Sequence, residues 1–99
     1  MFFLNRKNIN DAVEECRRTP GAVLLDVREA EEFRAGHIPG AANIPLRQIG
    51  ALRLSMEKPL FVYCLRGARS RQAANKLKKM GYTAKSIGGI MGYQGQLER

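Results

Sequence analysis

The chain has few of the residues that metal sites, disulfide frameworks and membrane spans require. Its 99 residues include two cysteines and one histidine, and these show no spacing typical of zinc ligands. Two cysteines far apart in the sequence also argue against a disulfide framework and favour a reducing compartment. No apolar run approaches the roughly 20 residues of a membrane-spanning helix. We therefore expect no metal, no cofactor and no membrane association, and we expect the protein in the cytoplasm.

Acidic residues are also few: nine stand against 17 basic ones, and the formal net charge is +8. This charge favours an anionic small substrate or an acidic protein partner through electrostatic steering. Nucleic acid is the other class of anionic partner. The densest basic stretch, at residues 76–79, lies at the end of an expected helix, where cations complement the helix dipole, and no nucleic-acid motif is present. A solvated helix face is therefore favoured over a nucleic-acid site.

Helical and extended patterns alternate along the chain, which we expect to form one domain over residues 1–99. Helices are expected at residues 8–18, 29–35, 46–54, 70–80 and 90–98. Strands are expected at residues 22–27, 42–44, 60–63 and 83–87. This alternation is typical of an α/β fold, in which helices cover both faces of a parallel sheet. Ligands of such folds bind beyond the carboxyl ends of the strands.

Cys64 is the group whose surroundings indicate the most chemistry. It follows the apolar run 60–63 and precedes the helical pattern that starts at Ser70. Loop N–H groups and the helix dipole converge at such a position, and Arg66 and Arg69 add positive charge. Surroundings of this kind lower the pKa of a cysteine from about 8.5 to roughly 3.5–7.5. We interpret Cys64 as a nucleophile in an anion-binding loop, and a buried, inert cysteine is the alternative.

Four motifs together resemble the rhodanese-like domain family over residues 8–96. They are Asp26-Val27-Arg28 at a strand end, Gly36-His37-Ile38-Pro39-Gly40-Ala41, the loop Cys64-Leu65-Arg66-Gly67-Ala68-Arg69-Ser70, and Gly88-Gly89 followed by Tyr93 in place of the family's common Trp. The resemblance implies a three-layer rhodanese-like fold with a five-stranded parallel sheet flanked by helices. It also implies a sulfurtransferase that moves a sulfane sulfur from a donor such as thiosulfate to a thiol or cyanide through a persulfide on Cys64.

The site that this resemblance implies has one nucleophile and one binding loop. Cys64 is the expected catalytic residue, and the expected substrate-binding residues are Leu65, Arg66, Gly67, Ala68, Arg69 and Ser70. Arg69 either binds the donor's oxyanion or pairs with a buried carboxylate such as Asp26, and both roles stay open. Arg66 is expected to point to solvent and substrate. Ser70 either serves the start of the helix or donates a hydrogen bond to the persulfide.

Other residues with chemical potential are assigned to structure. His37 is expected to satisfy backbone groups within its turn, Cys16 to lie in the core, and Asp26 and Arg28 to build the rim of the site. Cys64 therefore has no evident general base. Sulfur transfer suits this arrangement, because the loop alone can prepare the thiolate for an attack on sulfur.

Three other functions are alternatives to an enzyme that transfers sulfur between small molecules. A phosphatase or arsenate reductase is disfavoured because four residues separate Cys64 from Arg69, whereas the related dual-specificity phosphatases have five. A non-catalytic interaction module is disfavoured because such domains often lack the cysteine. A persulfide carrier in a sulfur-delivery pathway keeps the chemistry and changes only the partner. The sequence names neither the donor nor the acceptor, and it fits a monomer or a homodimer.

Overall fold

The computed structural model describes residues 8–99, and its first element is the helix α1, Ile9–Arg18. The side chain of Asn8 caps this helix by accepting a hydrogen bond of 3.0 Å from the N–H of Asp11. One face of α1 is buried, and it carries Ile9, Ala12, Val13 and Cys16. The helix expected at residues 8–18 is confirmed, and Cys16 is a core residue as expected.

Four parallel strands form one sheet in the order β2-β1-β3-β4. Their bounds are β1 Val23–Asp26, β2 Ala42–Asn43, β3 Leu60–Cys64 and β4 Ala84–Gly89. The four strands that the sequence pattern predicts are thus confirmed as strands, in the same succession along the chain, whereas the pattern predicts no order for them within the sheet. The five-stranded sheet implied by the family resemblance is corrected to four strands within residues 8–99, because that part of the chain supplies only four extended segments.

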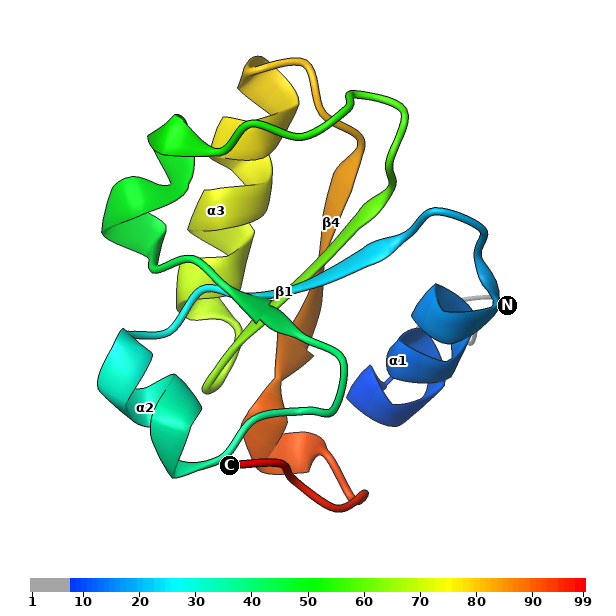
Figure 1. The fold of residues 1–99 in the computed structure, drawn as a ribbon, viewed down its shortest axis with the longest axis vertical. Coiled ribbons are helices and arrows are strands. Elements are labelled where there is room, and N and C mark those ends of the chain that lie inside the picture. The colour runs from blue at the N-terminus through cyan, green and yellow to red at the C-terminus, as the bar shows by residue number, and fades with distance from the viewer. Residues whose placement is uncertain (1–7) are drawn as a thin grey trace.

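Helices cover both faces of the sheet (Figure 1). Helix α1 packs against one face, and helix α3, Ala68–Lys79, packs against the other together with the 3₁₀ helix η2, Leu46–Ala51. Strand β3 is buried along its whole length, as a central strand of a parallel sheet requires. Its side chains alternate, so that Leu60, Val62 and Cys64 belong to the α3 side and Phe61 and Tyr63 to the α1 side.

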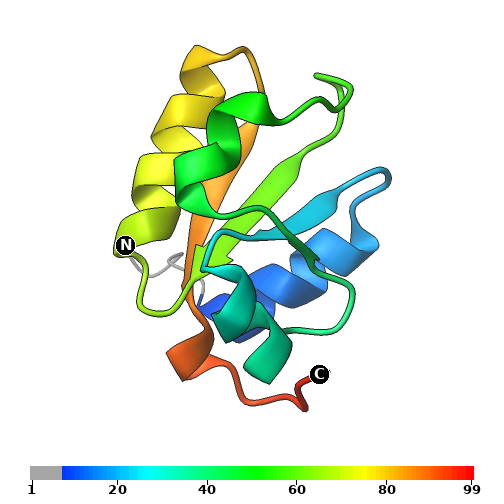
Figure 2. The same ribbon diagram turned by 60° about the vertical axis from the view of Figure 1, so that its left-hand side comes forward.

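The carboxyl end of the sheet gathers the segments from which a site can be built. The loop after β3, the short helix α2, Ala30–Ala35, and the C-terminal segment all lie at this end of the molecule (Figure 2). Helix α2 begins with a capping box, in which the Glu29 N–H donates to Glu32 Oε1 over 2.9 Å. The helix predicted at residues 29–35 is therefore confirmed.

The helix expected at residues 46–54 is wrong in type and length. The chain forms the 3₁₀ helix η2 over six residues and then becomes extended at Leu52. The Tyr82 hydroxyl accounts for this early end, because it accepts a hydrogen bond of 3.0 Å from the Leu54 N–H and donates one of 3.2 Å to the Leu52 carbonyl. These backbone groups are therefore bonded across the fold instead of along a helix.

The terminal helix expected at residues 90–98 is also wrong, since only one 3₁₀ turn forms there, η3, Ile90–Gly92. Two glycines, at 92 and 95, weaken a helix in this segment. The chain end is instead held by a long-range antiparallel bridge, in which His37 and Glu98 exchange two backbone hydrogen bonds of 2.8 Å each. None of the described helices has the length and apolar character needed to cross a membrane.

Candidate active site

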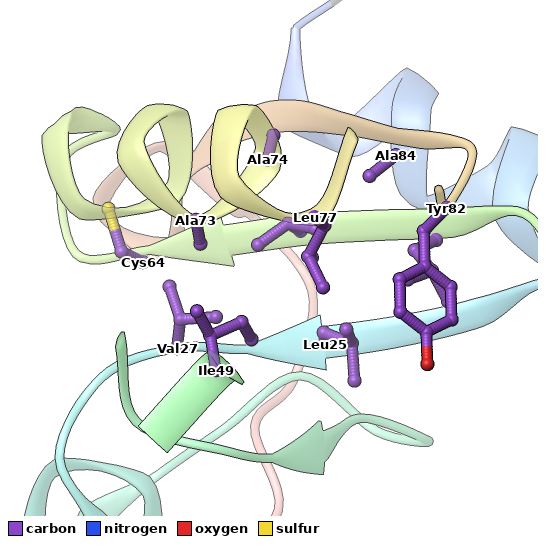
Figure 3. Close-up of a cluster of buried hydrophobic side chains, with 11 residues drawn as sticks. Leu25, Val27, Ile49, Cys64, Ala73, Ala74, Leu77, Tyr82 and Ala84 are labelled. Carbon is purple, nitrogen blue, oxygen red and sulfur yellow. The ribbon is translucent and has the colours of Figure 1, made fainter. Parts of the chain in front are cut away.

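Cys64 stands at the last position of β3, with its sulfur directed toward the first turn of α3 (Figure 3). The side chain is buried, and the sulfur accepts hydrogen bonds from two backbone N–H groups, those of Gly67 at 2.9 Å and Ser70 at 3.3 Å. Gly67 is the N-cap residue of α3 and Ser70 its third residue, and no side chain caps this helix. The sulfur therefore occupies the position of a capping acceptor at a helix N-terminus, where negative charge is favoured.

The loop closes around the sulfur because two glycines permit its path. Gly67 adopts φ +115°, in the region that side chains disfavour. Gly89 lies so close to the loop that a Cβ there would overlap the Leu65 carbonyl and the Arg66 Cα. In the sequence, Gly88-Gly89 marks the end of an expected strand and one of the four family motifs. The close approach of strand and loop was missed, because it depends on how the two segments pack.

Two serines, Ser70 of α3 and Ser86 of β4, connect the cysteine loop to strand β4. The Ser70 hydroxyl lies 3.6 Å from the Cys64 sulfur, 3.0 Å from the Gly67 carbonyl and 2.6 Å from the Ser86 hydroxyl. Ser70 is fully buried, so its hydroxyl must be satisfied within this network. Ser70 thus lies in the first turn and near the sulfur, as both alternatives for it require. Ser86 was not anticipated, because a serine in an expected strand gives no sign of its partner.

The pKa of Cys64 is lowered from its ordinary value by this arrangement. Burial alone would raise the pKa, but hydrogen bonds from the Ser70 side chain and from the N–H groups of Ser70, Gly67 and Arg66 outweigh the burial. The direction agrees with the expectation from the sequence. Among the causes expected from the sequence, the N–H groups of the loop and of the first turn of α3 contribute to the lower pKa. By contrast, the pKa of Cys16 is raised by its burial in the core.

A pH profile of alkylation should therefore separate the two cysteines. We expect Cys64 to react with iodoacetamide with a midpoint below about 8.5, the value of a free thiol, because its thiolate accepts the loop hydrogen bonds. Cys16 should react slowly at every pH up to that value, since burial opposes its ionisation. The Cys16→Ser variant isolates the Cys64 signal. A Cys64 midpoint at or above about 8.5 would remove the anion-binding role of the loop.

Arg69 braces the loop through a carboxylate that the sequence did not single out. Its guanidinium donates to Glu32 of α2 in a bidentate pair of 2.7 and 3.1 Å, with each side chain about one third exposed. Asp26, the example of a carboxylate that Arg69 could pair with, does not take this role, because Arg28 already occupies it. Glu32 joins α2 to the loop, since it also accepts from the Glu29 N–H. In this structure Arg69 therefore braces the loop, which was one of its two open roles.

The Glu32–Arg69 pair should contribute stability that depends on pH. The hydrogen bond from Arg69 lowers the pKa of Glu32 from 4.5 to about 2, against an opposing effect of burial. Because the folded value is the lower one, the stabilisation is fully present above pH 4.5 and is lost as the pH falls toward 2. For this partly exposed pair we expect Glu32→Gln to lower the free energy of unfolding by roughly 0.5–1 kcal/mol at pH 7.

Urea unfolding at a series of pH values tests this expectation. The difference between the wild type and Glu32→Gln should stay constant from pH 7 to about pH 5 and then shrink between pH 4.5 and about pH 2. The exposed neighbour Glu31 provides the matched control, Glu31→Gln. A difference that persists unchanged at pH 2 would show that the carboxylate charge of Glu32 is not its source.

Asp26 and Arg28 form the rim beside the loop, as expected. Both are buried, and Arg28 Nη2 donates to Asp26 Oδ2 over 2.7 Å and to the Gly36 carbonyl over 2.7 Å. The pair thereby ties the end of β1 to the end of α2. His37 also keeps its expected structural role, since its Nδ1 lies 2.9 Å from the Phe33 carbonyl and its ring stacks on Phe33.

The outer residues of the loop face solvent. Arg66 is exposed, as expected, and Ala68 is exposed at the start of α3. Leu65 is half-buried and lines a groove of about 530 Å³ beside the loop together with Arg66, Gly88 and Met91. Arg71 was not singled out by the sequence. Its guanidinium lies over the loop, 3.4 Å from the place a Cβ on Gly67 would take.

The chain is similar to several known proteins in sequence and in fold. YqhL of Bacillus subtilis, an uncharacterized protein, is 47% identical over 64 residues, which are 63% of this chain and 51% of YqhL. The chain thus spans about half the length of that relative. The thiosulfate sulfurtransferase GlpE of Pseudomonas savastanoi is 34% identical over 79 residues, which are 78% of this chain and 74% of GlpE. The structure of a human single-domain sulfurtransferase superposes with a TM-score of 0.71 at 31% identity and covers 80% of this chain and 85% of its own.

One family model matches nearly the whole described structure. The model of the rhodanese-like domain extends over residues 9–96. It therefore includes α1, the four strands and the loop that encloses the Cys64 sulfur. On this match, which agrees with the fold and with the four motifs of the sequence, the chain belongs to the rhodanese-like domain family.

Proposed function

We propose that the chain is a sulfurtransferase that accepts a sulfane sulfur on Cys64 from a donor such as thiosulfate and passes it to a thiol or cyanide. The observation that carries this proposal is the sulfur of Cys64 at the centre of a short closed loop, where it accepts from the Gly67 and Ser70 N–H groups. These donors stabilise a thiolate without a general base. Relatives named as thiosulfate sulfurtransferases support the choice of chemistry.

The first half-reaction transfers one sulfur atom to the enzyme. The Cys64 thiolate attacks the outer sulfur of thiosulfate, a sulfur–sulfur bond forms, and the bond between the two thiosulfate sulfurs breaks. Sulfite leaves with that bond's electron pair, and no proton transfer is required at the sulfur. The persulfide that remains carries its negative charge on the terminal sulfur, which the loop and the helix N-terminus stabilise.

The second half-reaction returns the enzyme to its starting state. An acceptor thiolate or cyanide attacks the terminal sulfur, and the electron pair of the broken sulfur–sulfur bond returns to Cys64. This attack on sulfur is analogous to thiol–disulfide exchange. Because a covalent intermediate separates the two halves, the kinetics should be ping-pong.

The loop favours sulfur over phosphate on geometric grounds. Cys64 is 1% exposed, and four residues separate it from Arg69. A terminal sulfur is a single atom that can enter such a recess, whereas a phosphoryl group brings three further oxygens. Arg69 is also engaged with Glu32, so it is not placed as a free cation for phosphate. The proposed donor is therefore a sulfane sulfur compound, and phosphatase or arsenate reductase activity is the less favoured alternative.

The proposal includes the setting in which the reaction occurs. Both cysteines are free, and the chemistry requires a Cys64 that stays reduced between turnovers. A reducing compartment preserves this state, and we place the protein in the cytoplasm. The carrier alternative, in which a protein persulfide supplies or receives the sulfur, uses the same two half-reactions.

Steady-state kinetics test the proposed activity. With thiosulfate and cyanide as substrates, the double-reciprocal plots should give parallel lines, and sulfite and thiocyanate should form in equal amounts. Cys16→Ser serves as the matched cysteine control and should keep the activity. Turnover of an aryl phosphate should be negligible beside sulfur transfer. Hydrolysis of the aryl phosphate at a comparable rate would contradict the proposed role of the loop.

A further inference from the structure

The mouth of the cysteine loop is flanked by cations that have no acidic partner among residues 8–99. Arg66 is exposed at the tip of the loop, and the Arg71 guanidinium lies over Gly67. Neither forms an ion pair or a side-chain hydrogen bond within the described residues, although Arg28, Arg47 and Arg69 each have a carboxylate. These three arginines therefore occupy Asp26, Glu29 and Glu32, whereas Arg66 and Arg71 are left to solvent.

Helix α3 extends this positive surface away from the loop. It carries five basic residues and no acidic one. At 100° per residue, Arg71 and Lys78 lie on the same flank of the helix, about 20° apart, and Lys79 lies next to Lys78 on the outer face. All three side chains are exposed. A field of one sign therefore runs from the mouth of the loop along α3.

A largely apolar groove adjoins Arg66, which forms part of its lining. The groove of about 530 Å³ is lined by the loop, the end of β4, the turn η3 and the start of α1. The Met91 N–H joins η3 to the loop by donating to the Leu65 carbonyl over 3.2 Å. Met91, which is 65% exposed, and Leu65 both line the groove. Gly88 and Gly89 also line it and contribute no side chains. This volume is typical of sites for much larger ligands than thiosulfate.

We infer that this surface docks an acidic protein partner that exchanges sulfur with Cys64, and that an apolar side chain of the partner inserts beside Met91. The inference rests on the proposed sulfur transfer and names the class of its protein substrate. Charge complementarity selects an acidic partner, since Arg66 and Arg71 are free cations at the mouth of the loop. A protein fits better than a nucleic acid, because among residues 8–99 the groove is lined mainly by aliphatic side chains, methionine and glycine, with no aromatic ring on which a base could stack.

Sulfur transfer to short cysteine peptides tests this inference. The probe is the peptide Asp-Glu-Leu-Cys-Gly-Asp-Glu, and its two matched controls carry Asn and Gln in place of the acids, or Ala in place of Leu. The acceptor thiolate attacks the terminal sulfur of the Cys64 persulfide, and Cys64 leaves as a thiolate. Each rate is divided by the rate of the same peptide with the persulfide of β-mercaptoethanol, which removes differences in thiol pKa between peptides.

We expect the acidic peptide to react about tenfold faster than its amide control at 10 mM salt, within the range of electrostatic steering. The advantage should shrink at 150 mM salt, where the Debye length falls from roughly 30 Å to about 8 Å. Arg71→Gln should reduce the advantage about threefold. Arg18→Gln removes the same charge from the exposed end of α1, near the amino end of the sheet, and should leave the advantage unchanged. Met91→Ala should slow the Leu peptide and not the Ala peptide.

Two outcomes would overturn the inference. The first is equal normalised rates for the acidic and amide peptides. The second is stronger inhibition by tRNA than by the acidic peptide with its Cys replaced by Ser, which would make the surface a nucleic-acid site. Binding of that Ser peptide, measured by fluorescence anisotropy, does not require a persulfide. Peptide binding without sulfur uptake would therefore refute the proposed function alone, and sulfur uptake without a preference for the acidic peptide would refute the docking surface alone.

Discussion

Replacing Arg28 with methionine should lower the free energy of unfolding by about 3–5 kcal/mol, the cost of leaving a buried charge without its partner. Asp26 is 0% exposed, and its carboxylate receives three side-chain contacts of 2.7–3.0 Å from Arg28. The same guanidinium also satisfies the buried Gly36 carbonyl. Methionine fills part of the volume and supplies no donor to either acceptor. A loss of this size is a large share of the 5–15 kcal/mol typical of a small domain.

The matched control for Arg28→Met is the same substitution in an ion pair that is exposed to solvent. Arg47 pairs with Glu29 at 3.0 Å, and their side chains are 64% and 47% exposed. Arg47→Met should therefore cost less than about 1 kcal/mol. Urea unfolding of both variants, followed by circular dichroism, gives the comparison. If Arg28→Met costs no more than Arg47→Met, the rim of the site does not depend on the buried pair.

Inserting one glycine between Gly67 and Ala68 should abolish most sulfur transfer. The insertion enlarges the loop and moves the N–H groups of Gly67 and Ser70 relative to the sulfur, which they now approach at 2.9 and 3.3 Å. Loss of one such donor to a developing anion costs about 10²–10³ in kcat in well-studied enzymes. We expect a loss in this range, together with a rise of the Cys64 pKa toward that of a free thiol. Binding of phosphate should improve, because the larger loop has more room for its oxygens.

The control for this insertion is one glycine added to a surface connection that takes no part in the proposed reaction. Met56 and Glu57 are both exposed in the connection that precedes β3, and surface connections tolerate added residues. One glycine between them should leave the alkylation midpoint and the transfer rate nearly unchanged. Thiosulfate kinetics and the iodoacetamide profile of both insertions decide the matter. Full activity in the variant with the longer Cys64 loop would mean that loop length does not select sulfur.

The position of Cys64 could be predicted from the sequence because local signals agree. The apolar run before it is a buried central strand, and the helical spacing after it is α3. Alternation along β3 then places Cys64 on the side of α3, where the helix terminus meets it. Asp26 and Arg28 were likewise assigned to the rim, because both stand at the end of a strand that is parallel to β3.

The partner of Arg69 could not be predicted, because two carboxylates are in reach of the same rim. Whether a guanidinium selects Asp26 or Glu32 depends on the angle at which α2 packs beside α3, and no local pattern encodes that angle. Occupation of Asp26 by Arg28 decides the choice. Glu32 lies six positions after Asp26 in the sequence, next to a second glutamate, Glu31. A carboxylate on the first turn of a helix at the rim is the signal that could have identified it.

The C-terminal segment was predicted wrongly because its conformation comes from distant contacts. The pattern at residues 90–98 suggests a helix, but the backbone of Glu98 pairs with His37, 61 positions earlier in the chain. Leu97 packs at the side of Gly36, where a Cβ would lie 3.2 Å from the Leu97 Cδ1. Contacts of this kind override the weak helical preference of a segment with two glycines.

Mass spectrometry of the protein after treatment with thiosulfate tests the central claim most directly. Intact mass should rise by one sulfur atom, about 32 Da, as formation of a persulfide requires. Peptide mapping should place the added sulfur on Cys64, Cys64→Ser should take up none, and Cys16→Ser should take up as much as the wild type. Sulfur found on Cys16 alone, or no added sulfur on the wild type, would contradict the assignment of Cys64 as the residue that carries sulfur.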